Sequence, residues 1–133
     1  MGDRAVFGFR AYEDEPLVFL YSHWGGASQE SDLREALLFA TPRHNDGSYG
    51  MRMMLTHLTR DAGEGDTGYG ISAGTSRTSV AGDYDFMYIV DFPTRKVQMV
   101  YSTDLTNVIS EAGFDEFIRN PFALSSDRLL EVW

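Results

Sequence analysis

The chain has 133 residues, of which 43% are hydrophobic and 14% aromatic, and it contains no cysteine. A chain of this length and composition is expected to form a single folded domain over residues 1–133. The missing cysteines exclude a disulfide framework, a thiolate zinc site and a cysteine nucleophile. The net charge of −9 repels a phosphate backbone, so direct nucleic-acid binding is not expected. No stretch approaches the ~18 apolar residues of a membrane span, and no membrane association is expected.

The first predicted element is a β-hairpin. Residues 5–12 (AVFGFRAY) and 17–22 (LVFLYS) are rich in aromatic and β-branched residues, which is typical of strands. The four residues between them, 13–16 (EDEP), are typical of a turn.

Two helices are predicted next. The first is expected to begin with Ser31 as its N-cap and to end at Pro42, because proline cannot continue a helix. Its apolar residues recur at spacings of three and four along the chain: Leu33, Ala36, Leu37 and Ala40. The second helix is expected to start near Ser48 and to end at residues 62–63. It has the same apolar spacing: Met51, Met54, Leu55 and Leu58.

Three strands are predicted in the second half of the chain. The glycine-rich stretch 63–82 is expected to be loop around one short strand at 69–72, and the sequence leaves open whether it forms a lid. Residues 84–92 (YDFMYIVDF) and 97–101 (VQMVY) form a second predicted hairpin.

A short helix around residues 114–118 is expected to stop at Asn120, before Pro121, and the tail 127–133 is predicted to form a further helical turn. The order of elements is then strand, strand, helix, helix, three strands and helix. This order predicts an α+β domain with an antiparallel sheet of about five strands and two to three helices on one face.

The candidate binding site is the segment 21–26 (YSHWGG). Gly25 and Gly26 allow a ligand to approach the backbone, and the amides at the start of the next helix attract anions. Trp24 offers a stacking face, and His23 a hydrogen-bond donor or proton carrier. This combination suits a nucleotide. An ordinary strand-to-helix turn with the tryptophan in the core explains the same residues, and the sequence leaves both interpretations open.

A second group of residues is expected to form the opposite wall of this pocket. It consists of Arg43, Tyr49 and Arg52, and the neighbouring His44 is also expected to bind the ligand. Arg52 follows Tyr49 by three positions and therefore lies on the same side of the predicted helix. In the alternative interpretation, Tyr49 packs against the helix end and both arginines neutralise nearby acids.

The sequence has no catalytic signature. No serine lies in a G-x-S-x-G motif, and the glycines at 65, 68 and 70 lack the preceding strand and following helix of a dinucleotide site. The histidines show no pair at helical ligand spacing, so no metal or cofactor is predicted. A metal site built from His23, His44 and Asp46 is disfavoured, and a hydrolase that uses His23 and Asp46 is the last-ranked alternative.

Five short motifs occur in order: GDR at 2–4, YSHWGG at 21–26, REAL at 34–37, D-x-x-Y-x-x-R at 46–52 and GYGIS at 68–72. Over residues 2 to about 101 they resemble a family of small accessory proteins of bacteriophages, especially those that infect actinobacteria.

This resemblance implies a protein of the host cytoplasm that acts by binding, without catalysis, and inhibits a host protein or a defence system. The predicted partner is a host protein or a small nucleotide-like ligand. A protein that sequesters a nucleotide signal is the main alternative. The sequence leaves the oligomeric state open, a homodimer included.

Overall fold

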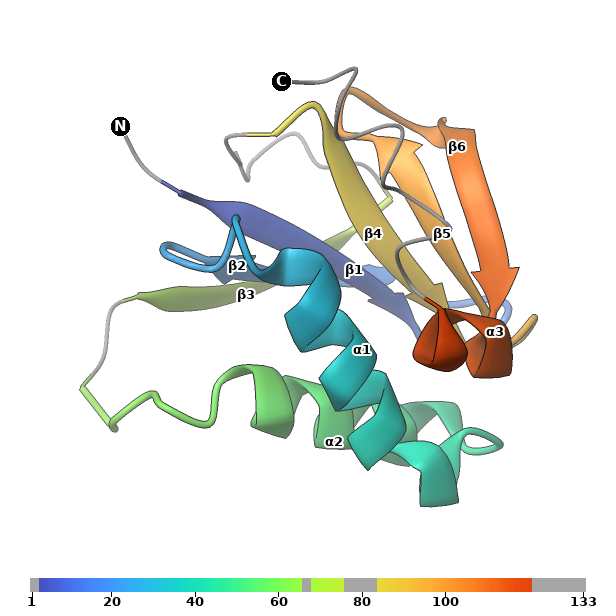
Figure 1. The fold of residues 1–133 in the computed structure, drawn as a ribbon, viewed down its shortest axis with the longest axis horizontal. Helices are drawn as coiled ribbons and strands as arrows, with labels where there is room; N and C mark the ends of the chain where they lie inside the picture. The colour runs from blue at the N-terminus through green and yellow to red at the C-terminus, as the bar shows by residue number, and fades with distance from the viewer. Residues whose placement is uncertain (1–2, 66–67, 76–83, 121–133) are drawn as a thin grey trace.

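In the computed structural model, which describes residues 3–65, 68–75 and 84–120, a six-stranded sheet carries three α-helices on one face (Figure 1). The strands are β1 (Ala5–Arg10), β2 (Leu17–Ser22), β3 (Tyr69–Gly74), β4 (Phe86–Asp91), β5 (Lys96–Tyr101) and β6 (Asp104–Gly113). The helices are α1 (Gln29–Phe39), α2 (Gly47–Leu58) and α3 (Phe114–Arg119), with a 3-10 turn η1 (Thr41–Arg43) between the first two. The predicted α+β class is confirmed. The helical turn predicted at 127–133 lies outside the described residues.

The sheet is mixed, whereas a purely antiparallel sheet was predicted. Its strand order is β3-β2-β1-β4-β5-β6, and β1 and β4 are parallel while every other neighbouring pair is antiparallel. The chain forms both helices after β2, returns as β3 on the outer side of β2, and then enters the sheet again beside β1. Parallel strands require a long connection of this kind, and strand-by-strand sequence patterns do not reveal it.

The prediction of about five strands missed β6, which pairs with β5. The sequence of β6 (DLTNVISEAG) does not alternate between apolar and polar residues, and most of the strand is exposed or half-buried. The pairing also shifts register between Met99 and Tyr101. An irregular edge strand of this type gives only a weak period-two signal.

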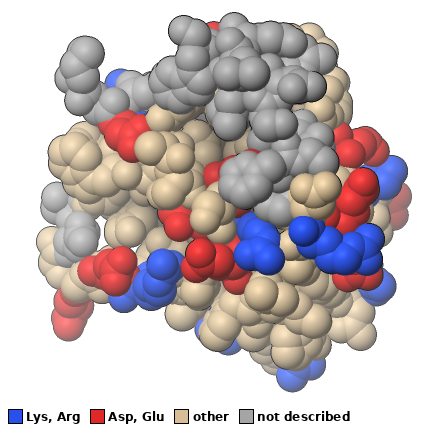
Figure 2. Space-filling view, in the orientation of Figure 1, with Lys and Arg blue, Asp and Glu red and all other residues tan. Residues whose placement is uncertain are grey.

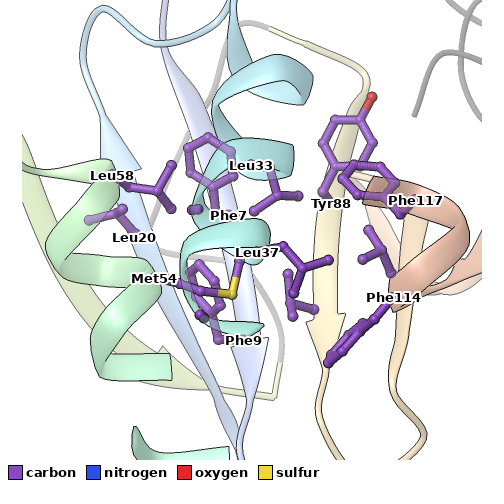
Figure 3. Packing of buried hydrophobic residues seen from close by; sticks show 14 of the residues in the cluster. Phe7, Phe9, Leu20, Leu33, Leu37, Met54, Leu58, Tyr88, Phe114 and Phe117 are labelled. Atoms are coloured by element: carbon purple, nitrogen blue, oxygen red, sulfur yellow. The ribbon is translucent and has the colours of Figure 1, made fainter. Parts of the chain in front are cut away.

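The main core lies between the sheet and the helices. Alternate residues of the central strands point toward the helices, among them Phe7, Phe9 and Tyr88, as Figure 3 shows. From the helices, the buried side chains are Leu33 and Leu37 of α1, Met54 and Leu58 of α2, and Phe114 and Phe117 of α3. The predicted apolar faces of the first two helices are therefore the buried faces.

The first two helices differ from their predicted bounds. α1 begins at Gln29, with Ser28 rather than Ser31 at its N-cap, and the Ser28 hydroxyl donates to the carboxylate of Asp32 at 2.7 Å. α2 begins at Gly47, close to the predicted start, and ends at Leu58, before residues 62–63. A Cβ atom at Gly47 would overlap the carbonyl of Ala11. Glycine is therefore needed where α2 starts against the end of β1.

Candidate functional site

Asp3 ties the bend between β2 and α1 to the N-terminal segment. The amide of Gly26 donates to the carbonyl oxygen of Asp3 at 2.7 Å, and the amide of Ala27 donates to the Asp3 carboxylate at 3.0 Å. The hydroxyl of Tyr84 donates to the other carboxylate oxygen. The sequence suggests the Gly26 amide as a hydrogen-bond donor to a bound anion, but this amide already donates to Asp3 within the chain. A phosphate group would have to displace Asp3 to reach it.

Trp24 projects from this bend and is 72% exposed. The interpretation that places it in the core is wrong. The ring of His23 packs edge-on against the indole, with ring centroids 4.2 Å apart and an interplanar angle of 85°. His23 is held in turn by the hydroxyl of Tyr21, 2.9 Å from its Nδ1, and its backbone amide donates to the carbonyl of Gly68 at 2.9 Å. The exposed indole of Trp24 therefore packs against a histidine ring that is itself held by two hydrogen bonds of His23.

A cavity of about 310 Å³ opens beside Trp24. Its floor is apolar, its rim carries two aromatic side chains and its walls carry two carboxylates. The described lining consists of Phe7, Leu20, Ser22, Trp24, Gly25, Ser28, Asp32, Leu58, Asp61, Gly68 and Tyr69. Among these residues there is no lysine, arginine or histidine, so the charge that the described walls present is negative.

The predicted second wall lies elsewhere. Ser22, next to His23, pairs with Ala5 at the first residue of β1. At the other end of β1, the hydroxyl of Tyr12 donates to Asp46, just before α2. The strand between these points is roughly 17 Å long, at about 3.3 Å per residue. The structure therefore separates Arg43, His44 and Tyr49, near the start of α2, from Trp24, while Arg52 lies further along α2 and outside the described cavity lining. It does not bring His23 near enough to Asp46 for a hydrolytic pair or a shared metal.

The side chains of this second group contact their own neighbours. The guanidinium carbon of Arg43 lies 5.2 Å from the ring centroid of Tyr49. Nε2 of His44 is 2.8 Å from the carbonyl oxygen of Leu37, and Arg52 donates to a threonine hydroxyl one turn later on α2 at 3.1 Å. These contacts are with neighbouring residues of α1, η1 and α2, and none is with a residue of the described cavity lining. The proposed neutralisation of nearby acids by the arginines has no ion pair to support it among the described residues.

Among the polar residues of the cavity that sequence reasoning missed are Asp32, Asp61 and Tyr69. Asp32 looked like an ordinary acidic residue in the first turn of a helix, and Asp61 like a polar residue of a turn. Tyr69 follows α2 after a connection whose sequence does not indicate with which strand the next segment pairs. The pairing of β3 with β2 places Tyr69 opposite Ser22, and the packing of α2 against α1 brings Asp61 to the same cavity as Asp32.

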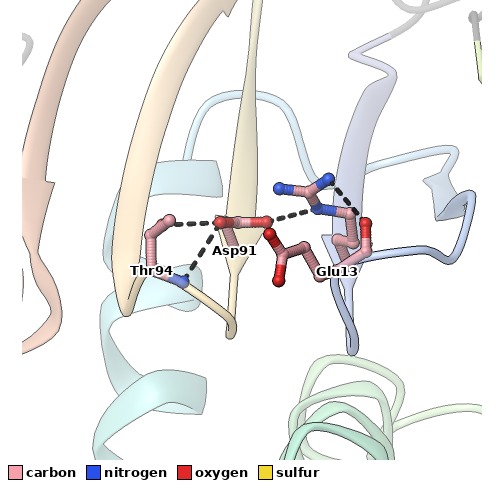
Figure 4. Close-up of polar contacts among 4 residues, drawn as sticks. Glu13, Asp91 and Thr94 are labelled. Atoms are coloured by element: carbon pink, nitrogen blue, oxygen red, sulfur yellow. Dashed lines mark hydrogen bonds and ion pairs between the residues drawn. The ribbon is translucent and has the colours of Figure 1, made fainter.

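A separate polar cluster lies on the opposite face of the sheet, at the ends of β1 and β4 (Figure 4). Nε of Arg10 donates to the buried carboxylate of Asp91 at 2.6 Å, and the backbone and hydroxyl of Thr94 donate to its other oxygen. Burial raises the pKa of Asp91, but the hydrogen bonds from Arg10 and Thr94 outweigh burial, so that this pKa is lowered. The same ion pair raises the pKa of Arg10. Both charges are paired, which favours a structural role.

On the face shown in Figure 2, acidic and basic side chains lie next to one another in a band across the middle of the molecule. This face is not divided into one acidic and one basic area. Recognition by a broad field of one sign therefore has no support there, and the local chemistry of a pocket becomes the more informative feature.

No protein-family model, curated protein or solved structure matches the chain. None of the helices in the part of the chain that the structure describes is long and apolar enough to cross a membrane. Within the same residues, no group of three or more histidine, aspartate or glutamate side chains is arranged to hold a metal ion.

Proposed function

We propose that this protein acts by binding a host protein, as the resemblance to bacteriophage accessory proteins implies, and that the face around Trp24 makes the contact. The observation that carries this proposal is the exposed, braced indole beside a cavity. An exposed tryptophan side chain forgoes the favourable free energy of burial, which it gains when a partner covers it. Tryptophan is also among the residues that contribute most binding energy at protein interfaces.

The bracing of Trp24 supports a binding role. Contacts with His23, which Tyr21 holds in place, restrict the indole before any partner arrives. Binding by a side chain that is already ordered loses less conformational entropy than binding by a mobile one. One arrangement thus accounts for the three ring-bearing residues of the segment 21–26, because Tyr21 holds His23 and His23 holds Trp24.

The residues around the cavity favour binding over catalysis. Ser22 and Ser28 line it, but the hydroxyl of Ser28 donates to Asp32. In the described lining no histidine stands beside either serine to act as the base of a nucleophilic triad. His23, the nearest histidine in sequence, supports Trp24 instead.

A nucleotide signal is the second candidate ligand, and the exposed indole is the observation that favours it, since a base stacks on such a face. Two carboxylates in the cavity and the occupied Gly26 amide oppose the phosphate groups. Calorimetry with linear and cyclic nucleotides separates the candidates. The protein-binding proposal predicts no heat of binding with any of them.

The test of the proposal is affinity capture from an actinobacterial host lysate, followed by calorimetry with the purified captured protein. Wild-type protein is compared with Trp24→Ala and with Tyr49→Ala, a control aromatic residue that is 57% exposed at the other end of α1. We expect Trp24→Ala to weaken binding at least tenfold and Tyr49→Ala to leave it unchanged. Turnover of nucleotides or esters that His23→Ala abolishes would overturn the proposal.

A further inference from the structure

We propose that the cavity beside Trp24 receives an arginine side chain of the protein partner. This inference rests on the proposed function, because it names the chemistry that the binding face recognises. It is argued from the apolar floor, the aromatic rim and the charged walls of the cavity, in that order.

The floor of the cavity suits an aliphatic stem. Phe7, Leu20 and Leu58 belong to the main core and close the inner end of the cavity. A short polar or purely ionic ligand would leave these groups without contacts. The three methylene groups of an arginine side chain lie readily along such apolar surface while the charged head stays near polar groups.

The rim suits a planar cation. Trp24 and Tyr69 line the cavity, and Tyr69 lies opposite Ser22 on the neighbouring strand. Guanidinium groups stack on aromatic faces, and tryptophan provides the strongest attraction of this kind. An ammonium group interacts with the same rings but lacks the planar surface that stacks on them.

The walls supply the opposite charge. Asp32 and Asp61 come from α1 and from the segment that follows α2, so the carboxylates reach the cavity from different elements. One oxygen of Asp32 already accepts the Ser28 hydroxyl, which fixes that carboxylate in place. A guanidinium offers five N–H donors and is able to bond to two carboxylates at once, whereas a phosphate would be repelled by both.

The surroundings favour an arginine that belongs to a polypeptide. Ile71 lies two residues after Tyr69 on β3 and therefore on the same face of the sheet, and it is 65% exposed. It provides an exposed apolar side chain beyond Tyr69, and the indole of Trp24 provides another at the cavity itself. A free amino acid would contact only the cavity, whereas a protein segment would also cover Trp24 and Ile71. The net charge of −9 favours approach of a basic partner.

The experiment titrates wild-type protein with four probes and follows binding by heat and by NMR. The probes are the blocked tripeptide acetyl-Ala-Arg-Ala-amide, the same peptide with citrulline, the same peptide with lysine, and free arginine. Citrulline keeps the shape of arginine but removes the charge. We expect the arginine peptide to bind about tenfold more tightly than the citrulline peptide, and more tightly than the lysine peptide and free arginine.

Variants locate the binding. Asp32→Asn and Asp61→Asn are each expected to weaken the arginine peptide about threefold to tenfold, and Trp24→Ala to remove measurable binding. Asp115→Asn, an acidic residue of α3 outside the described lining, is the charge-matched control and is expected to change nothing. Amide NMR spectra of every variant confirm that it is folded.

Equal binding of the arginine and citrulline peptides, or no binding of the arginine peptide to folded wild-type protein, would overturn the inference. Tighter binding of free arginine or of the lysine peptide would overturn the assignment to a partner's arginine. The proposed function fails separately. Capture of a partner that depends on Trp24 but not on Asp32 or Asp61 would refute only the arginine inference. Arginine binding without any partner that depends on Trp24 would refute the proposed function, and with it the assignment of the arginine to a partner, but not the selectivity of the cavity for arginine.

Discussion

The two ends of α1 carry the same kinds of residue but use them differently. At the N-terminal end, Trp24 is exposed beside a cavity whose described walls carry carboxylates. At the C-terminal end, Arg43 packs over Tyr49, and His44 lies within hydrogen-bond distance of a carbonyl of α1. An aromatic residue next to charged residues therefore does not define a binding site. What distinguishes the first end is that its exposed tryptophan lines a cavity together with two carboxylates. At the second end Arg43 and Tyr49 contact each other, and neither lines the separate cavity of about 340 Å³ to which His44 contributes.

This difference predicts that substitutions at the C-terminal end act on stability and that most substitutions at the N-terminal end act on binding. The largest effect is expected for Gly47→Ala, because the new Cβ would overlap the carbonyl of Ala11 and the backbone there cannot move freely. We expect a loss of about 3 kcal/mol in the free energy of unfolding. Urea denaturation measures it.

Gly63→Ala is the matched control for this prediction. A Cβ atom at Gly63 meets no atom within 4 Å, and no described glycine has a positive φ. The free energy of unfolding should be unchanged or raised by up to about 1 kcal/mol, since alanine restricts the unfolded chain. If Gly47→Ala lowers the free energy of unfolding no more than Gly63→Ala does, α2 does not pack closely against the end of β1.

A second large effect is expected from the ion pair of Arg10 with Asp91, which also lies at the C-terminal end of β1. Because the folded pKa of Asp91 is below its unfolded value of about 3.9, its stabilisation is complete above pH 4 and is lost as the pH falls through the folded pKa. Asp91→Asn should lower the free energy of unfolding by about 1–2 kcal/mol at pH 7.

Chemical denaturation from pH 2 to pH 7 checks this pH dependence. The difference between wild type and Asp91→Asn should shrink toward the acid end, where the wild-type carboxyl group is also protonated. A difference that stays constant across this range would mean that the charge of Asp91 does not contribute.

Asp3 is the exception at the N-terminal end, because its carboxylate bonds to the Ala27 amide and the Tyr84 hydroxyl. Asp3→Ala is expected to cost about 1 kcal/mol, as for the loss of a helix-capping side chain. Asp14→Ala, in the exposed turn after β1, should change stability by less than about 0.5 kcal/mol. Thermal unfolding of both variants compares them, and a neutral Asp3→Ala would remove the tie proposed for the bend.

The smallest stability effect is expected for Trp24→Ala, since its side chain is mostly in water. We expect a change below about 0.5 kcal/mol, together with the loss of binding predicted above. Thermal unfolding measures the stability change. A loss of 2 kcal/mol or more would mean that Trp24 holds the fold together and that its effect on binding is indirect.

The parts of the fold that local patterns determine were predictable from the sequence. The apolar spacing from Leu33 to Ala40 identified α1 and its buried face, and the apolar run within residues 84–92 identified β4. The parallel pairing of β1 with β4 was not predictable. It arises because β3 pairs with the outer side of β2, which leaves the other side of β1 for β4. Such a choice is made by tertiary packing rather than by local propensity.

The candidate site was predictable only in part. The motif around Trp24 and Gly25 marked residues that line the cavity, because glycines and an aromatic residue at a strand end have a local signature. Asp61 and Tyr69 have none, since each reaches the cavity only through the fold. Arg43 and Tyr49 illustrate the opposite error, in which residues of suitable chemistry were assigned to a wall that the length of β1 places out of reach.

The most direct test of the difference between the two ends is an NMR titration of the wild-type protein with the arginine tripeptide. The indole N–H signal of Trp24, assigned with a Trp24→Phe variant, and the backbone amides of Asp32 and Tyr69 are expected to shift as peptide is added. The amides of His44, Tyr49 and Arg52 should remain in place. Shifts confined to these last three residues, with Trp24 unmoved, would place the binding surface at the wrong end of α1 and contradict the account.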